Sequence, residues 1–441
     1  MFNFTPASRR NAQGQSLSFA PANIGRGVIW SLFAALLIII PLIFTKGFAL
    51  TLLSQMGIWI IMCLAYNMLF GQGGMLSFGH SVYSGLGAFF AIHAINLASG
   101  GKLPIPLTLI PLVGGVFGAL FGVLFGYVTT KKSGTPFAMI TLGIGEMVFV
   151  ATQMFPGFFG GEGGVTTNRV FGEAFMGINY GSAIQVYYLI AAWTFACVAG
   201  MFAFSRTPLG RISNAVRENP ERVEFFGYNT QYVRFIVLIV SAFFSGIAGG
   251  LSAINFEIVS GENVHAIRSG GILLATFIGG SLFFFGPILG AVIFAFFSIA
   301  LSEYTKAWQF YLGAFFVMMV MFAPGGLAGI LLTNLRVAKY GLFKRLRSPY
   351  VGLLLTGAVL SLAIIALIEI GYHLSLESAG GTTLKLFGFT VDAGTTTTWV
   401  AVIGTLIVAG VAFEIARRRF AKEWGSTQEL IEAQIKRESG S

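Results

Sequence analysis

Apolar stretches of about 20 residues recur along the chain, separated by short segments rich in glycine, proline or charge. Because a helix of this length spans the hydrocarbon core of a bilayer, each stretch predicts a transmembrane helix. The stretches lack the alternation of apolar and polar residues typical of membrane β-barrels. The sequence therefore predicts an all-α, polytopic transmembrane helical bundle of twelve helices, near residues 27–45, 48–70, 77–97, 104–130, 135–155, 183–205, 233–255, 270–284, 287–303, 308–332, 350–371 and 396–416. Re-entrant segments remain an alternative near 71–98 and 270–303.

The distribution of Lys and Arg predicts which side of the membrane each loop faces. The 441 residues carry a formal net charge of +10. The cations gather beside the apolar stretches, as the positive-inside bias requires, so the charge does not need a nucleic-acid partner. With a cytosolic N-terminus, the basic segments all face the cytosol: 131–132, 206–232, 336–347 and 417–419. The loops that are poor in Lys and Arg face the opposite side: 156–182, 256–269 and 372–395.

Changes in composition divide the chain into five parts. These are a cytosolic N-terminal segment, a ten-helix membrane core, a basic cytosolic linker, an additional transmembrane hairpin and a cytosolic tail: 1–26, 27–335, 336–349, 350–416 and 417–441. No small-x-small cleavage site follows the first apolar stretch, which predicts an uncleaved helix. In the tail, Ser426 and Glu429 have capping-box spacing and predict a short separate helix.

The side chains that support catalysis are not clustered in the sequence. The histidines are scattered, and both cysteines lie inside apolar stretches: His80, His93, His265, His373, Cys63 and Cys197. No pair of carboxylates and no metal-ligand spacing occurs. There is also no phosphate-binding GxxxxGK[ST] motif. We therefore expect a protein that is not an enzyme and binds no metal or cofactor, with any nucleotide bound by another polypeptide.

The most strongly charged segment of the core is the loop 206–232, which predicts a docking helix for a soluble partner. Asn219 suits the N-cap, Pro220 the first turn and Gly227 a left-handed stop, so a two-turn helix is expected over Pro220–Phe226. This helix should show Val223 and Phe226 on one side. An ordinary solvated loop with a surface helix is the alternative. The candidate docking residues are Arg211, Asn214, Arg217, Glu218, Asn219, Pro220, Arg222, Val223, Phe226 and Gly227.

A candidate translocation pathway follows from glycine pairs and from polar residues inside apolar stretches. Gly73-Gly74 and Gly279-Gly280 each stand at the start of an apolar hairpin, one in each half of the chain. Such paired interruptions are typical of transport pathways built from broken helices, although close helix packing is an alternative explanation. Polar residues in a membrane are functional candidates because burying them is costly. The candidate pathway comprises Asn67, Gly73, Gly74, Ser77, His80, Glu146, Gly279, Gly280 and Pro287.

Five segments within residues 27–335 carry a common pattern: Asn67–His80, Thr141–Glu146, Arg211–Asn219, Phe285–Ala291 and Pro324–Gly329. In this order they resemble the M-type permease subunits of branched-chain amino acid ABC transporters, and the run Asn67–His80 is similar to the hallmark of that family. Leu282 replaces a glycine of the family signature, and Gly160–Gly164 departs from the commoner Thr-Gly-Gly-Ser loop. These departures leave the solute open, and the last two helices lie outside the resemblance.

The resemblance implies a multi-pass permease subunit of a bacterial inner membrane. The implied partners are a homologous second permease, two cytosolic ATPase subunits that bind ATP and Mg²⁺, and a periplasmic solute-binding protein. The loop 206–232 would be the ATPase-coupling element. The expected cargo is a branched-chain amino acid or a related solute, since the family also imports urea, amides and aromatic acids.

Two other functions remain open at the level of sequence. An ion-gradient-driven secondary amino acid transporter would need several intramembrane carboxylates, whereas Glu146 is nearly alone. In a non-transporting membrane scaffold, the glycine pairs would serve helix packing only.

Overall fold

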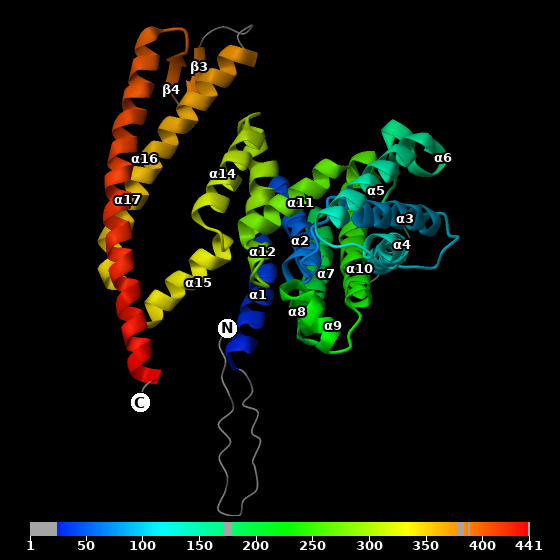
Figure 1. Ribbon diagram of the computed structural model, residues 1–441. Helices are drawn as coiled ribbons and strands as arrows, with labels where there is room; N and C mark the ends of the chain where they lie inside the picture. The colour runs from blue at the N-terminus through cyan, green and yellow to red at the C-terminus, as the bar shows by residue number, and fades with distance from the viewer. Residues whose placement is uncertain (1–23, 172–178, 377–382, 387–388, 440–441) are drawn as a thin grey trace, which may run out of the picture. The chain divides into compact units, whose positions relative to one another are not determined.

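Long helices make up most of the structure. The computed structural model describes residues 24–171, 179–376, 383–386 and 389–439, which form helices and two small two-stranded sheets (Figure 1). The predicted all-α, polytopic fold is confirmed. These residues belong to two compact units. One reaches to Thr276 and includes Gly290–Phe296, and the other contains Phe277–Leu289 and the residues from Phe297 onward.

The first unit contains most of the predicted core. Its helices and strands are α1 (Ile24–Ile43), α2 (Gly47–Asn67), the π-helix η1 (Met68–Gln72), α3 (Ser81–Ser99), η2 (Leu107–Leu109), α4 (Ile110–Thr129), α5 (Thr135–Met154), α6 (Pro156–Phe159), η3 (Gly161–Gly163), β1 (Val165–Thr166), α7 (Ala183–Arg206), α8 (Pro208–Glu218), α9 (Pro220–Phe225), α10 (Thr230–Phe256), β2 (Ile258–Val259) and η4 (Gly261–Asn263). The boundary between the units falls within α11 (Ala266–Gly279) and α12 (Gly286–Ala295).

The second unit is formed by the C-terminal part of the chain. Its further elements are η5 (Phe296–Leu301), α13 (Ser302–Tyr304), α14 (Trp308–Phe322), α15 (Gly326–Lys339), α16 (Phe343–Leu376), β3 (Thr383–Leu386), β4 (Phe389–Asp392) and α17 (Thr396–Ser439). The helices α16 and α17 lie side by side, and the β3–β4 hairpin lies between them in sequence (Figure 1).

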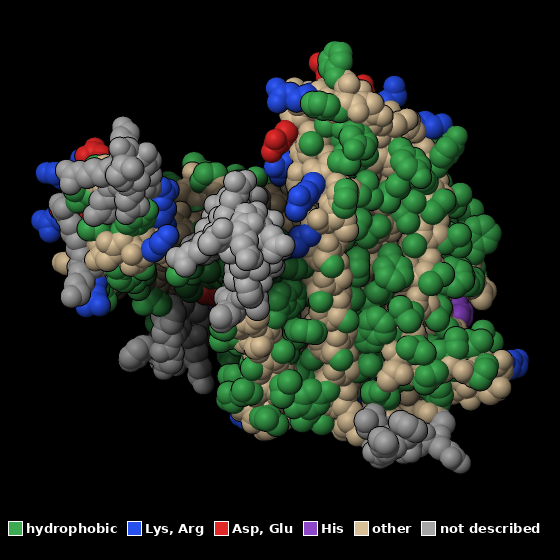
Figure 2. Space-filling view, turned by 90° about the horizontal axis from the view of Figure 1, so that it is seen from below, with side chains coloured by type: hydrophobic (Ala, Val, Ile, Leu, Met, Phe, Trp, Pro, Cys, Tyr) green, Lys and Arg blue, Asp and Glu red, His purple; other side chains and the backbone are tan. Residues whose placement is uncertain are grey.

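The lengths of the helices agree with a membrane protein. In the described part of the chain, nine helices are long and apolar enough to span a bilayer, and the bent pair α14–α15 provides a tenth candidate. Hydrophobic side chains cover much of the visible surface, and charged side chains are confined to a few groups (Figure 2). The predicted span 270–284 corresponds to α11, whose 14 residues extend only about 21 Å. That length falls short of a bilayer core, which favours the re-entrant alternative for this segment.

In the core of the first unit, the backbones of α3, α4 and α10 contact one another directly. A Cβ on Gly246 would lie 2.2 Å from the Gly114 carbonyl oxygen, and one on Gly249 would lie 1.8 Å from that of Ser84. Glycines in α4 recur every fourth residue from Gly114 to Gly126, a spacing that allows helix backbones to approach closely in membranes. These three helices therefore pack without intervening side chains at their crossings.

Two expectations about C-terminal helices are wrong. The single helix expected over 308–332 is divided into α14 and α15, which are bent by 48°. Pro324 cannot continue a helix easily, and Gly326 adopts a φ of +65°. The separate tail helix with an N-cap at Ser426 does not exist, because α17 continues through it and Ser426 Oγ donates to the Glu423 carbonyl oxygen. A hydroxyl that bonds the preceding turn is compatible with a helix interior.

Candidate functional site

The hallmark run forms a break in a helix at the centre of the first unit. We name residues 67–80 the glycine segment. The helix α2 ends at Asn67, and the chain widens into the π-helix η1 before it turns at Gly74, whose φ is +69°. π-Helical turns are rare and frequently mark functional sites. The break is therefore a structural feature of the segment that the glycine pair predicts.

The glycine segment contains buried polar atoms that no described residue satisfies. These atoms are Asn67 Oδ1, Gln72 Oε1, Ser77 Oγ and His80 Nδ1. An unsatisfied buried polar group costs about 1–3 kcal/mol, so native structures retain few of them. Four such atoms within one segment indicate a place where polar groups are needed for something other than stability.

His80 is held firmly in this segment. Its Nε2 lies 2.7 Å from Ser245 Oγ of α10. The rings of Tyr66 and Tyr83 contact the imidazole edge-on, with centroid distances of 5.1 and 5.8 Å. The next residue, Ser81, lies 2.6 Å from Ser269 of α11 between the two hydroxyl oxygens. Helices α2, α3, α10 and α11 thus all contact this short stretch.

The helix α5 also packs against the glycine segment, but Glu146 is not buried in it. The Phe78 amide donates to Thr141 Oγ1 at 3.2 Å, and a Cβ on Gly79 would lie 2.1 Å from the Thr141 carbonyl oxygen. Glu146, by contrast, is exposed on the surface of this single chain. Among the pathway candidates, Glu146 therefore differs from Asn67 and His80, which are buried.

The charged loop contains a helix that the sequence analysis missed. Thr207 caps α8 by accepting a hydrogen bond from the Gly210 amide at 3.2 Å. The helix is amphipathic, with Ser213 and Val216 buried and Arg211 and Glu218 exposed. A Thr-Pro pair followed by apolar residues at helical spacing is the signal that could have identified it.

The inner face of α8 lies directly on the glycine segment. Arg217 Nη1 donates to the Gly71 carbonyl oxygen, which belongs to η1. A Cβ on Gly74 would lie 2.7 Å from Arg217 Cγ, so only glycine allows this approach. Val216 packs in the same core cluster as Leu69 and Met75. Candidate residues from the coupling loop and from the pathway are thus brought into contact.

The predicted docking helix is present as α9. Asn219 Oδ1 accepts from the Arg222 amide at 2.9 Å, and Gly227 has a φ of +83°, so both ends form as the sequence predicts. The prediction that Val223 and Phe226 lie on one side of this helix is wrong. Val223 is 6% exposed within the core, whereas Phe226 is 76% and Phe225 90% exposed, because the helix ends at Phe225 and the chain turns there.

The remaining pathway candidates lie in the second unit, in a separate glycine contact. Gly280 has a φ of +104°, and a Cβ on Gly326 would lie 2.4 Å from the Gly280 Cα. Gly279 ends α11, and Pro287 is the second residue of α12. In each glycine pair, the second glycine has a positive φ and lies where a helix has ended.

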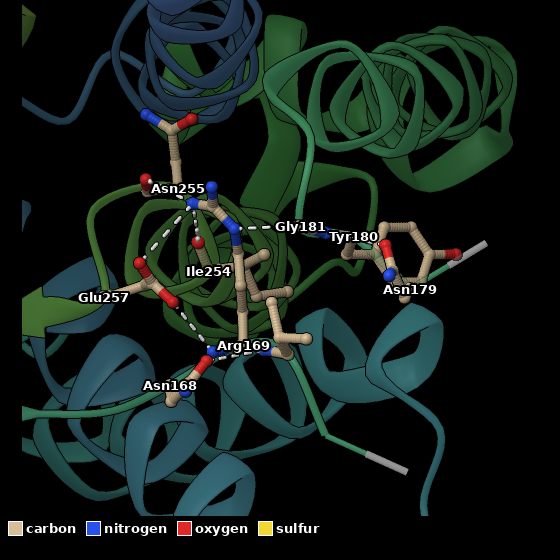
Figure 3. A network of polar contacts seen from close by, with 9 residues as sticks. Asn168, Arg169, Asn179, Tyr180, Gly181, Ile254, Asn255 and Glu257 are labelled. Carbon is tan, nitrogen blue, oxygen red and sulfur yellow. Dashed lines mark hydrogen bonds and ion pairs between the residues drawn. The ribbon is translucent and has the colours of Figure 1, made fainter. Parts of the chain in front are cut away.

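On the outward-facing side predicted from the charges, two loops are clamped together (Figure 3). β1 pairs with β2, and Arg169 joins their flanks. The Arg169 amide donates to Glu257 Oε1 at 2.8 Å, and its Nε donates to the Tyr180 carbonyl oxygen at 2.9 Å. Glu257 and Tyr180 both adopt a φ of +57°. Because non-glycine residues seldom adopt this conformation, the clamp holds a specific loop shape.

The described residues offer no group of three or more His, Cys, Asp or Glu side chains that could hold a metal ion. The geometry is that of a helical bundle with a polar, broken-helix interior, and α8 of the charged loop lies in contact with that interior.

The family of the chain is shown by its match to a family model. The model, described as branched-chain amino acid transport system / permease component, matches residues 48–325. The chain belongs to this family: it is a permease subunit of an ATP-binding cassette importer and a multi-pass protein of the bacterial inner membrane. The resemblance noted in the motifs is confirmed.

Individual relatives carry the same description. The high-affinity branched-chain amino acid transport system permease protein LivM of Salmonella typhimurium is 26% identical over 335 residues, which cover 70% of this chain and 77% of the relative. LivM of Escherichia coli gives the same identity and coverage. BraD of Pseudomonas aeruginosa is 23% identical over 293 residues, which cover 62% of this chain and 91% of the relative. No solved structure matches the chain significantly.

Proposed function

We propose that this permease subunit carries a branched-chain amino acid or a related small polar solute by alternating access, and that partner ATPases drive it through α8 and α9. The observation that carries the proposal is the contact of Arg217 with Gly71 and Gly74. It joins a helix of the cytosolic loop to the broken helix of the candidate pathway. A displacement of α8 therefore changes the backbone that bears Asn67, Ser77 and His80.

The surface of α9 suits a docking element. Phe225 and Phe226 are exposed on the charged loop, and Arg222 precedes them by about one helical turn. Aromatic and arginine side chains are the commonest anchors of protein interfaces. Glu224 Oε1 accepts from Thr230 Oγ1 at 2.7 Å, which ties the end of α9 to the start of α10. Force applied to α9 is thus received by a transmembrane helix.

The proposed assembly contains a second permease, two ATPase subunits with ATP and Mg²⁺, and a periplasmic solute-binding protein. The relatives are named as parts of transport systems, which supports separate partner subunits. A binding protein that docks beside the permease supplies solute at a high local concentration, so the permease itself needs little affinity. The clamped loops around Arg169 form a defined surface on the side where such a protein would dock.

Uptake of radiolabelled leucine into proteoliposomes that contain the whole transporter tests the proposal. Uptake should require ATP and Mg²⁺ on the ATPase side and should continue when an uncoupler removes the ion gradient. The matched control is the same preparation without the ATPase subunits. Uptake that persists without ATP and stops with the uncoupler would instead identify a secondary transporter.

A further inference from the structure

The start of α11 contains an arginine without an acidic partner. Arg268 Nη1 donates to Asn263 Oδ1, and this neutral amide is the side-chain partner that the structure gives it. Its Nε is shielded from solvent and has no hydrogen-bond acceptor. Within the described residues, no carboxylate forms an ion pair with Arg268. No carboxylate in the described part of the chain therefore compensates the charge of this guanidinium.

Arg268 lies on the packed face of its helix, beside the glycine segment. Ile272 and Ala275, one and two turns further along α11, are fully buried. The adjacent residue Ser269 accepts a hydrogen bond from the Ser81 amide at 2.9 Å, and Ser81 directly follows His80. The residue after Arg268 thus contacts the start of α3, one position along the chain from His80.

The location is unfavourable for an arginine whose role is structural. Charged groups in membrane bundles are costly and usually mark pathways for ions or solutes. The third position of a helix is also near the positive end of the helix dipole, which repels a cation. A single hydrogen bond to Asn263 could be made by a neutral residue. An anion beside Arg268 would compensate the charge of the guanidinium, and the positive end of the helix dipole would attract it.

We propose that Arg268 binds the carboxylate of the solute as it enters the polar interior of the permease. Guanidinium and carboxylate groups match as a two-bond fork, and the Nε edge of Arg268 is not used by the protein. The solute is then a carboxylate-bearing amino or organic acid rather than urea or a neutral amide. This inference rests on the proposed transport function and specifies its substrate class.

The first experiment measures leucine uptake by the reconstituted transporter carrying Arg268→Gln, Arg268→Lys or the exposed control Arg419→Gln. The maximal uptake rate of Arg268→Gln should fall roughly thirtyfold, as when a buried charge pair loses one partner. Arg268→Lys, which keeps the charge but not the fork, should give an intermediate rate, and Arg419→Gln should equal the wild type. Basal ATP hydrolysis should be unchanged in all three. Wild-type uptake by Arg268→Gln overturns the inference.

The second experiment uses the wild-type transporter, so that it does not depend on how a variant folds. Hydroxyphenylglyoxal modifies guanidinium groups, and mass spectrometry follows the modification of Arg268. Leucine should protect Arg268, whereas leucinamide, which lacks the carboxylate, should not. Equal protection by both compounds overturns the inference, as does a failure to modify Arg268 in any nucleotide state, because a solute must reach the residue.

Two controls separate other anions from the solute. Protection that occurs without leucine in phosphatidylglycerol vesicles, and not in phosphatidylcholine vesicles, would assign Arg268 to a lipid headgroup. Protection that depends only on the partner subunits would assign it to a carboxylate of the partner. Either result overturns the inference while leaving ATP-driven uptake intact. Absence of ATP-driven uptake in the wild type would contradict the proposed function itself.

Discussion

At the scale of single residues, two close approaches define this permease. Arg217 of α8 donates a hydrogen bond to the Gly71 carbonyl oxygen, and Gly74 allows the arginine stem to approach because it has no Cβ. Gly246 admits the backbone of α4 in the same way. We propose that the first contact couples α8 to the candidate pathway, whereas the second holds the core together, so their substitutions should have different consequences.

Substitution of Arg217 with Gln should uncouple ATP hydrolysis from transport. The shorter neutral side chain loses the charged hydrogen bond to Gly71, so uptake should fall about tenfold or more while ATP hydrolysis continues. Arg217→Lys keeps the charge and the stem against Gly74 and should retain more uptake. Parallel measurements of uptake and phosphate release check this, and equal losses in both would argue against a coupling role.

Substitution of Gly246 with Ala should destabilise the membrane core. The added Cβ would lie 2.2 Å from the Gly114 carbonyl oxygen, and backbones must move apart to admit it. Overpacking of this kind costs about 1–3 kcal/mol in the free energy of unfolding. Gly404→Ala is the matched control, because a Cβ there meets nothing within 4 Å. Titration with SDS in mixed detergent micelles measures the free energy of unfolding. It should be lower than that of the wild type for Gly246→Ala and unchanged for Gly404→Ala.

At the scale of elements, the sequence predicts features that depend on neighbouring residues, such as helix caps, but not contacts between distant segments. The caps of α9 are predictable because Asn219, Pro220 and Gly227 act on their own backbone. Apolar length predicts most membrane helices for the same reason. The contact of Arg217 with Gly71 joins residues 146 positions apart, and no periodicity in either segment specifies it. The inward position of Val223 likewise depends on tertiary packing with Val216 and Val233.

The exposed aromatic pair of α9 should anchor the ATPase. Simultaneous substitution of Phe225 and Phe226 with Ala removes two large side chains at the tip of the element and should weaken ATPase binding by roughly thirtyfold. Val170→Ala, an exposed apolar residue on the clamped loops, serves as the control. Titration of detergent-solubilised permease with the ATPase subunit measures the affinity. Unchanged binding by the double variant would mean that the anchor lies elsewhere on the loop.

At the scale of the whole molecule, the two ends of the first unit should face different compartments. The native cysteines Cys63 and Cys197 are buried, so a single introduced cysteine can be labelled with little background. Glu162→Cys should react with an impermeant maleimide in intact cells, and Glu221→Cys should react only in inverted vesicles. Both residues are exposed. Labelling of Glu221→Cys from outside intact cells would reverse the orientation that the charges predict.

The glycine crossings of α3, α4 and α10 have a consequence for the transport cycle. Helices that meet through side chains can slide by exchanging rotamers, but backbones in direct contact have no such freedom. We therefore expect these three helices to move as one block in the proposed alternating access, with bending at the joint where α2 widens into η1 and the chain turns at Gly74. If the glycine-packed core is rigid in this way, the proposed motion is concentrated at the joint that Arg217 contacts through the Gly71 carbonyl oxygen.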